Sequence, residues 1–321
     1  MMFSKILLNW YKINSRDFPW RRTKDPYKIW LSEIILQQTR IEQGMPYYIK
    51  FIKRFPTIFH LAKSKEEVIF KLWQGLGYYS RASNLHFTAK FIVKKYNGEF
   101  PKSFVELKKL KGIGDYTASA IASICFDISE AVIDGNVFRF LSRFFGIDTP
   151  INTNLGFKIF KEKANKLIKG NSPGDFNQAI MDFGSIQCKP KKPNCKACIF
   201  STKCFALKNK KVEYYPQKKN NLEVKTRFFN YLVIYNSKKQ IVLEKINRKG
   251  IWNKLYQFPL IESDKIINHP DNKFQEIIKK FSNEQSLQIA LINKKLITHK
   301  LSHQKFCLLY TSPSPRDLRK S

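Results

Sequence analysis

The sequence predicts two parts, a mainly α-helical N-terminal part and a smaller α+β C-terminal part. The chain has 321 residues, which exceeds the usual size of one domain, and 43% of them are hydrophobic. The sequence pattern changes after Cys204, where helical periodicity ends and is followed by a polar Lys/Asn-rich stretch and then by strand-like runs. We therefore expect a helical part at 1–206, a linker at 207–226 and an α+β domain at 227–310.

The helical part should begin with a short amphipathic helix that docks on the core, because apolar residues from Phe3 to Tyr11 recur at helical spacing. Asp25 and Pro26 then supply an N-cap and a first-turn proline for a helix to about Gln38. Glycine and proline separate the further helices. We expect these at 47–54, 64–74, 80–96, 103–110, 115–125, 136–145, 155–169 and 175–184.

The C-terminal domain should contain strands at 228–234, 240–245, 287–292 and 295–301 and a helix at 272–282. The last eleven residues, 311–321, are rich in Ser, Pro and Arg and fit neither part. We interpret them as a tail foreign to the natural protein, which leaves the C-terminal domain truncated.

The charge of the chain points to a polyanionic partner. The formal net charge is +33 and the isoelectric point is about 9.9. This is weak evidence on its own, because Lys, Asn and Ile are abundant throughout the sequence. No apolar run approaches the length of a membrane span, and the N-terminus has no secretory pattern, so we expect a cytoplasmic protein without a membrane partner.

Four of the six cysteines lie within seventeen residues, at Cys188, Cys195, Cys198 and Cys204. In a chain without a secretory signal, such a cluster indicates metal ligation rather than disulfides. Four thiolates suit either a structural zinc ion or a 4Fe–4S cluster. Lysines between the cysteines make the loop positively charged, whichever metal is bound.

A Gly-x-Gly turn, Gly112-Ile113-Gly114, separates two expected helices. Glycine lets the backbone approach a phosphate closely, and the N–H groups at the start of the second helix can then bind the anion. Such a turn is common, so its meaning depends on the residues that come after it in the chain.

Asp134 lies further along the chain in an apolar setting, Val132-Ile133-Asp134-Gly135-Asn136, at the expected start of a helix. It is an N-cap candidate. A carboxylate at a helix N-terminus should stay ionised, and an ionised carboxylate can stabilise a cationic sugar.

The hairpin, the aspartate and the cysteines, in this order, resemble the helix-hairpin-helix iron–sulfur DNA glycosylase superfamily over residues 1 to about 205. The resemblance implies a helix-hairpin-helix glycosylase fold with six-helix and iron–sulfur subdomains. It implies a 4Fe–4S cluster on the four cysteines and double-stranded DNA as the partner, contacted at Gly112 and Gly114.

Further motifs resemble the adenine DNA glycosylases of the MutY type, namely Arg16–Arg21, Trp30–Thr39 and Gly75–Ala82. The apolar neighbours of Glu33 should raise its pKa and make it a general acid. The resemblance implies catalytic roles for Glu33, Asp134, Tyr116 and Asn136. It implies an adenine pocket of Trp20, Arg21, Leu36 and Gln178, with Gln38 and Tyr78 inserted into the DNA.

The C-terminal domain resembles, more loosely, the MutT/Nudix-like module that recognises 8-oxoguanine in these enzymes. The similarity lies in Gly250–Pro259 and Leu301-Ser302-His303, with Leu301 where the family usually has Phe. The resemblance implies that Ser302 and His303 read 8-oxoguanine. The pattern needed for pyrophosphate hydrolysis is absent from the sequence, so the module should bind without reacting.

We therefore expect a monomeric, nucleoid-associated bacterial repair enzyme that excises adenine mispaired with 8-oxoguanine or guanine and leaves an abasic site. Relatives that resemble endonuclease III carry a nucleophilic Lys where Tyr116 stands, so this enzyme should hydrolyse without cutting the strand. Lys111 is the residue to watch if strand cleavage occurs. The alternatives are an endonuclease III-like glycosylase/lyase for oxidised pyrimidines and a non-catalytic iron–sulfur DNA-binding protein.

Overall fold

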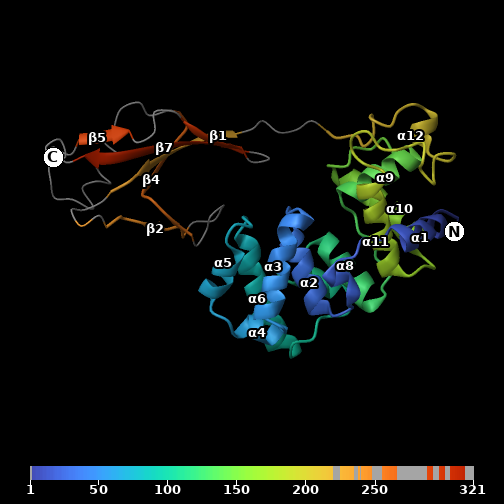
Figure 1. Cartoon of the computed structure of the whole chain (residues 1–321), viewed down its shortest axis with the longest axis horizontal. Coiled ribbons are helices and arrows are strands. Elements are labelled where there is room, and N and C mark those ends of the chain that lie inside the picture. The colour runs from blue at the N-terminus through green and yellow to red at the C-terminus, as the bar shows by residue number, and fades with distance from the viewer. Residues whose placement is uncertain are drawn as a thin grey trace. The chain divides into compact units, whose positions relative to one another are not determined.

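Figure 1 presents the chain as a computed structural model. It describes residues 2–219, 225–234, 238, 240–247, 255–265, 288–291, 296–300 and 304–314. The chain divides into two units, Met1–Lys219 and Asn220–Ser321. In the described part, no helix is long and apolar enough to cross a membrane.

The first unit is helical, as expected. Its elements are α1 (Met2–Asn14), η1 (Pro19–Arg22), α2 (Pro26–Leu36), α3 (Ile41–Arg54), α4 (Ile58–Lys63), α5 (Glu66–Trp73), α6 (Ser80–Tyr96), α7 (Phe104–Lys109), α8 (Asp115–Phe126), α9 (Gly135–Phe145), α10 (Asn154–Ile168), α11 (Pro173–Ile186) and α12 (Phe205–Lys208). The sequence missed the short helix α4. The helix expected at 47–54 begins six residues earlier, at Ile41, and runs through Pro46.

These helices form two lobes, one built from α2–α8 and the other from α1 and α9–α12 (Figure 1). The N-terminal helix belongs to the second lobe, since α1 packs along α11. Leu7 is fully buried, the Ser4 hydroxyl donates to the Leu167 carbonyl at 2.7 Å, and the Trp10 ring meets Phe183 edge-on at 5.0 Å. The chain therefore crosses from the second lobe to the first and back, which places residues from both lobes around one space.

The helical unit extends to Lys219, further than the expected boundary at 206. We expected a linker from residue 207, but residues 211–219 pack on the second lobe. The buried Arg143 donates from Nε to the Val212 carbonyl at 2.9 Å, and the Ile151 N–H donates to the Gln217 carbonyl at 3.0 Å. A Lys/Asn-rich composition concealed these contacts, because they are made by the backbone of the segment.

The described part of the second unit contains a sheet in the order β4 (Leu260–Ser263), β1 (Lys225–Leu232), β7 (Gln304–Ser314), β5 (Gln288–Leu291), with β6 (Ile297–Lys300) also paired to β7. Strand β1 is parallel to β7, and the other pairs in this sheet are antiparallel. Strands β2 (Glu244–Lys245) and β3 (Tyr256–Gln257) form a separate antiparallel pair. Phe229, Tyr231 and Phe306 form one small buried cluster on this unit.

Two expectations for this unit need correction. Strand β7 continues to Ser314, so the first four residues of the expected tail pair with the sheet: Thr311 lies opposite Leu232 of β1 and Leu291 of β5. Of the expected strand 240–245, only Glu244–Lys245 is a strand. The strands expected at 228–234, 287–292 and 295–301 correspond to β1, β5 and β6, and the helix expected at 272–282 lies outside the described residues.

Candidate active site

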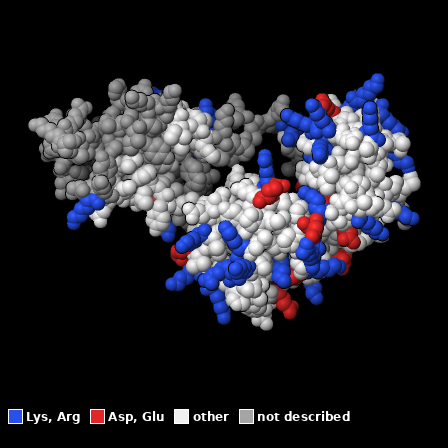
Figure 2. Space-filling view, in the orientation of Figure 1, with Lys and Arg blue, Asp and Glu red and all other residues white. Residues whose placement is uncertain are grey.

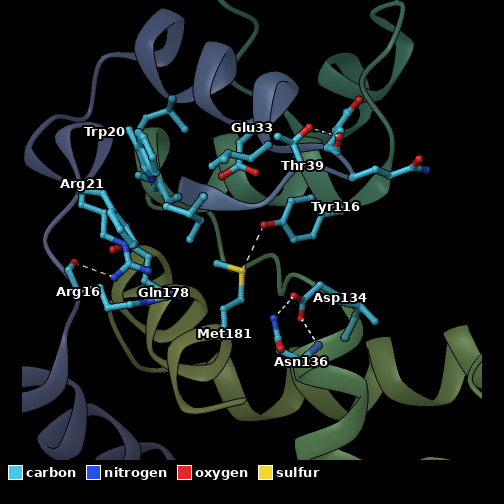
Figure 3. A pocket seen from close by; sticks show the side chains of 18 residues that line it. Arg16, Trp20, Arg21, Glu33, Thr39, Tyr116, Asp134, Asn136, Gln178 and Met181 are labelled. Carbon is cyan, nitrogen blue, oxygen red and sulfur yellow. Dashed lines mark hydrogen bonds between the residues drawn. The ribbon is translucent and has the colours of Figure 1, made fainter. Parts of the chain in front are cut away.

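A cavity of about 460 Å³ lies between the two lobes of the helical unit (Figure 3). Elements α2 and α8 of the first lobe and α9 and α11 of the second contribute to its lining, together with the segment around η1. Its 18 lining residues are Arg16, Phe18, Trp20, Arg21, Ile29, Glu33, Leu36, Gln37, Gln38, Thr39, Ile41, Tyr116, Ile124, Ile133, Asp134, Asn136, Gln178 and Met181. All eight residues expected to be catalytic or to line the base pocket are among them.

Glu33 enters the cavity from the middle of α2, a helix whose neighbouring residues Ser32, Ile34 and Ile35 are buried. Removal from water raises the pKa of Glu33 to about 7, partly opposed by a hydrogen bond from Tyr116 and by the charge of Arg21. A carboxyl group with this pKa can carry a proton near neutral pH and release it to a ligand.

Tyr116 lies beside Glu33, on the first turn of α8 (Figure 3). Burial, followed by the nearby Glu33 and Asp134, raises its pKa well above the ordinary value for a phenol. Its hydroxyl has one proton, which can be donated either to the Glu33 carboxylate or to the Met181 sulfur 3.2 Å away. The side chain is therefore a neutral hydrogen-bond donor rather than an amine-like nucleophile.

Asp134 caps the N-terminus of α9, as expected. Its Oδ1 accepts from the N–H groups of Asn136 and Val137 at 3.0 and 2.8 Å, and its Oδ2 accepts from Asn136 Nδ2 at 2.8 Å. The helix terminus alone would lower the pKa of this carboxyl. Burial has the larger effect and raises the pKa above its usual value, against these three donors. We expected the helix terminus to keep this carboxyl group ionised, and burial works against that.

The amide of Asn136 is held in one orientation. Its Nδ2 donates to Asp134, while its Oδ1 accepts from Arg139 Nη2 at 2.8 Å. Gly184 of α11 makes room for this arrangement, since a Cβ there would lie 2.7 Å from the Asn136 carbonyl oxygen. Glycine at this position lets α9 and α11 approach closely beside the site.

The opposite wall of the cavity contains the residues expected to hold a base. Trp20 stacks on Phe18 with ring centroids 5.1 Å apart and an interplanar angle of 20°. Arg21 and Gln178 lie on the same side of the cavity (Figure 3). A flat aromatic surface beside amide and guanidinium donors suits a planar heterocycle with ring nitrogens.

Two residues that the sequence reasoning missed fix this wall. Asp182, whose side chain has no solvent exposure, accepts from Arg21 Nη1 at 2.6 Å and from Arg16 Nε at 2.9 Å. The Tyr11 hydroxyl donates to Gln178 Oε1 at 2.7 Å, which leaves the Gln178 NH2 group as a donor. An acidic residue amid the apolar run Ala179–Phe183 was the available signal for Asp182.

The residues expected to contact DNA lie in turns, and Gln38 also lines the cavity. Gly112 has φ +82° in the turn between α7 and α8, and a Cβ at Gly114 would meet nothing within 4 Å. Gln38 and Tyr78 are exposed and adopt left-handed backbone conformations, with φ +54° and +48°. Ser302 and His303 lie outside the described residues.

The four clustered cysteines surround one small cavity in the second lobe, with Phe140, Phe183 and Phe200 among its walls. Arg143 Nη1 donates to Cys188 Sγ at 3.4 Å. The donor set and its partly apolar, N–H-lined surroundings fit an iron–sulfur cluster or zinc. Among the described residues, no group of three or more His, Cys, Asp or Glu side chains is close enough together to bind a metal ion.

Basic side chains are scattered over the surface of the helical unit. In Figure 2, groups of Lys and Arg side chains stand on several sides of the visible face, with smaller acidic patches among them. The five lysines of the cysteine loop are all exposed: Lys189, Lys191, Lys192, Lys196 and Lys203. A surface of this kind attracts a polyanion irrespective of its sequence.

Comparisons with known proteins point to one family. Residues 31–166 match the family model of the HhH-GPD superfamily of base excision DNA repair proteins. The chain is 38% identical over 319 residues to an adenine DNA glycosylase of Buchnera aphidicola (subspecies Baizongia pistaciae), covering 98% of this chain and 85% of the relative. It is also 38% identical over 213 residues to human adenine DNA glycosylase, covering 64% and 39% of the two chains.

Two solved structures resemble the helical unit. A thermostable thymine-DNA glycosylase has a TM-score of 0.61 and 32% identity, over 65% of this chain and 96% of its own. A non-covalent complex of endonuclease III with DNA has a TM-score of 0.56 and 20% identity, over 65% and 96% of the two chains, and this likeness concerns the fold alone.

Proposed function

We propose, on the basis that this chain belongs to the adenine DNA glycosylases of the HhH-GPD superfamily, that Glu33 and Asp134 break the N-glycosidic bond of an adenine flipped into the cavity. The observation that carries the proposal is the half-buried carboxyl group of Glu33, with a pKa of about 7, facing a second carboxyl group across one cavity. Flipping the base out of the duplex costs a few kcal/mol and exposes the bond to both groups.

In the proposed reaction, protonated Glu33 donates to N7 of adenine while the bond between N9 and the sugar C1′ breaks. The base leaves as neutral adenine, and the sugar becomes an oxocarbenium-like cation. The Asp134 carboxylate stabilises this cation, and Tyr116 and Asn136 position the two carboxyl groups. Water adds to C1′ and its proton is released, which leaves an abasic site and returns Glu33 to its acid form by proton exchange. The division of roles parallels that of two-carboxylate glycosidases.

The lining of the cavity supports hydrolysis without strand cleavage. None of its 18 lining residues is a lysine. By the resemblance, Tyr116 stands where endonuclease III-like relatives carry a nucleophilic lysine, and Lys111 lies with its Nζ 4.7 Å from the centroid of the Phe87 ring. An endonuclease III-like lyase mechanism needs an amine at the sugar, so the lining favours a monofunctional glycosylase.

We assign duplex DNA as the partner. The α7–α8 hairpin with Gly112 and Gly114 would bind a backbone phosphate, while Gln38 and Tyr78 would enter the base stack beside the flipped adenine. The basic surface supplies the sequence-independent part of the affinity. We expect the protein to act as a monomer at the nucleoid.

For the four cysteines we propose a 4Fe–4S cluster that organises the lysine-rich loop for DNA contact. Cys188, Cys195, Cys198 and Cys204 would hold it, and their common cavity supports the assignment. The cluster would supply structure rather than a step of the base excision.

For the second unit we propose a MutT/Nudix-like role in recognising 8-oxoguanine opposite the adenine, through Ser302 and His303. The chain-long similarity to an adenine DNA glycosylase supports this role, since 98% of this chain takes part in it. The substrate would then be adenine mispaired with 8-oxoguanine or guanine.

A single-turnover assay on duplexes with adenine opposite 8-oxoguanine or guanine tests the reaction. Asp134→Asn should reduce the rate about 10²–10³-fold, because it removes the negative charge opposite the cationic sugar. Asp127→Asn is the matched control, since Asp127 is exposed and pairs with Lys24 at the surface. Near-normal adenine release by Asp134→Asn would remove this residue from the mechanism.

The same duplexes separate the two rival functions. Efficient trapping of the protein on abasic DNA by borohydride would favour the lyase. Tight binding of the wild-type protein to the mispair without any base release would favour a non-catalytic DNA-binding protein.

A further inference from the structure

Arg81 is a buried cation that the proposed reaction does not use. It lies in the first turn of α6, is 7% exposed and forms no ion pair within the described part of the chain. Burial lowers its pKa to about 10. A buried charge without a carboxylate is costly, so its hydrogen-bond partners must compensate.

The guanidinium of Arg81 joins two segments that are about forty residues apart in sequence. Nη1 donates to oxygens at the end of α2 and in the following turn: the carbonyls of Ile34 (3.3 Å), Ile35 (2.9 Å) and Gln37, and Thr39 Oγ1 (3.2 Å). Nη2 donates to the carbonyls of Leu76 and Gly77, both at 3.1 Å, in the turn before α6. The guanidinium also lies 5.1 Å from the centre of the Trp73 ring.

Each of these segments carries one exposed residue, Gln38 or Tyr78, whose backbone is left-handed although it is not a glycine. Gln38 lies between the Arg81 acceptors Gln37 and Thr39, and Tyr78 comes directly after the acceptor Gly77. Such a conformation costs a residue other than glycine on the order of 1–2 kcal/mol, and it persists only where the surroundings impose it. The Arg81 guanidinium also lies 5.7 Å from the centre of the Tyr78 ring.

We propose that Arg81 is a positioning residue that fixes Gln38 and Tyr78 relative to each other, so that both side chains enter the duplex as one preformed unit. The inference rests on the proposed DNA contacts of these two residues. A planar guanidinium can serve both turns at once, whereas a lysine ammonium is a single point with three donors and cannot span them in this way.

A double-mutant cycle tests the inference. Arg81→Lys, Tyr78→Ala and the double variant are compared with wild type for single-turnover adenine release and for the Kd of a mispaired duplex. If Arg81 acts by placing Tyr78, each single variant should lose about tenfold and the double variant no more than the worse single one. Multiplying losses, about 100-fold in the double variant, would overturn the proposal.

Controls separate this role from simple destabilisation. Arg54→Lys, at an exposed arginine at the end of α3, should match wild type in both measurements. If Arg81→Lys does not fold, Thr39→Val takes its place in the cycle, because it removes only one acceptor of the guanidinium. The same criterion applies to it.

Because the Kd of the duplex can be measured without base release, it tests the role of Arg81 independently of the proposed chemistry. A wild-type protein that binds the mispaired duplex but releases no adenine would contradict the proposed function. In that case the non-additivity of the two substitutions in Kd still decides the role of Arg81.

Discussion

At the scale of single residues, the cavity contains two carboxyl groups in different surroundings. Both are removed from water, which raises both pKa values. Asp134 accepts three hydrogen bonds at the start of α9. At Glu33, the rise in pKa is opposed mainly by one hydrogen bond from the Tyr116 phenol and by the charge of Arg21. The donors around Asp134 stabilise its charged form, and their scarcity at Glu33 favours the protonated form. This difference is the physical reason for the acid role proposed for Glu33 and the charge-stabilising role proposed for Asp134.

With Glu33 as the proposed acid, its protonation should set the pH dependence of adenine release. Only the protonated form can donate, and the pKa is about 7. The single-turnover rate should therefore be highest below this pKa and fall about tenfold for each pH unit well above it.

Glu33→Gln should remove this decline together with most of the rate, because the amide has no acidic proton to give. Glu42→Gln, at an exposed position on α3, should keep the wild-type profile. A wild-type rate that stays flat between pH 6 and pH 9 (about two units above the pKa) would contradict the role of Glu33 as the acid.

At the scale of elements, the two glycines of the α7–α8 hairpin have different roles. Gly112 allows the tight turn, and Gly114 leaves the space beside the hairpin open. Gly112 has a left-handed backbone, and a Cβ there would lie 2.9 Å from Asn84 Cβ. Gly114 has an extended backbone with φ −89°, and a Cβ there would stand in open space where a phosphate would approach. The contact with Asn84 therefore disfavours a larger residue at Gly112, whereas only the proposed phosphate would disfavour one at Gly114.

Alanine at these two positions should separate stability from binding. Gly112→Ala should lower the free energy of unfolding by about 1–2 kcal/mol and weaken duplex binding, since it strains the turn. Gly114→Ala should leave the unfolding free energy nearly unchanged and still weaken binding, because its methyl group obstructs the phosphate.

Denaturant unfolding and duplex titrations at two salt concentrations measure both effects. Undiminished affinity of Gly114→Ala would exclude the hairpin from phosphate binding. Equal stability of Gly112→Ala and wild type would show that the turn can relax without cost.

At the scale of the whole molecule, the path of the chain creates the site. Helix α1 belongs to the lobe of α9–α12, and the chain then builds the other lobe before it returns. The cavity consequently draws on residues from Arg16 to Met181. The helical unit is complete only at Lys219, since Arg143 donates to the carbonyls of Val212 and Tyr215.

Truncation tests both the boundary and the role of the second unit. A fragment of residues 1–219 should release adenine opposite guanine like the full chain, but should lose the preference for 8-oxoguanine. A fragment of residues 1–206 should melt at a lower temperature, because Arg143 is left with fewer acceptors at a buried position.

Melting curves and the single-turnover ratio for the two mispairs are the measurements. An unchanged preference for 8-oxoguanine in residues 1–219 would remove that role from the second unit. Equal melting temperatures of the two fragments would show that residues 207–219 do not stabilise the helical unit.

The sequence by itself determined most helices, the cap at Asp134 and the hairpin, and its resemblance to a known family implied eight of the 18 residues that line the cavity. These features depend on local signals: periodicity, capping residues, glycine in a tight turn, and motif spacing. Only the tertiary structure decided how Asp182 holds Arg16 and Arg21, how Arg81 ties two turns together, and how far burial raises the pKa values of Glu33 and Asp134. Burial and long-range hydrogen bonds depend on which distant segments come into contact in the folded chain. Short stretches of a single sequence do not reveal these contacts.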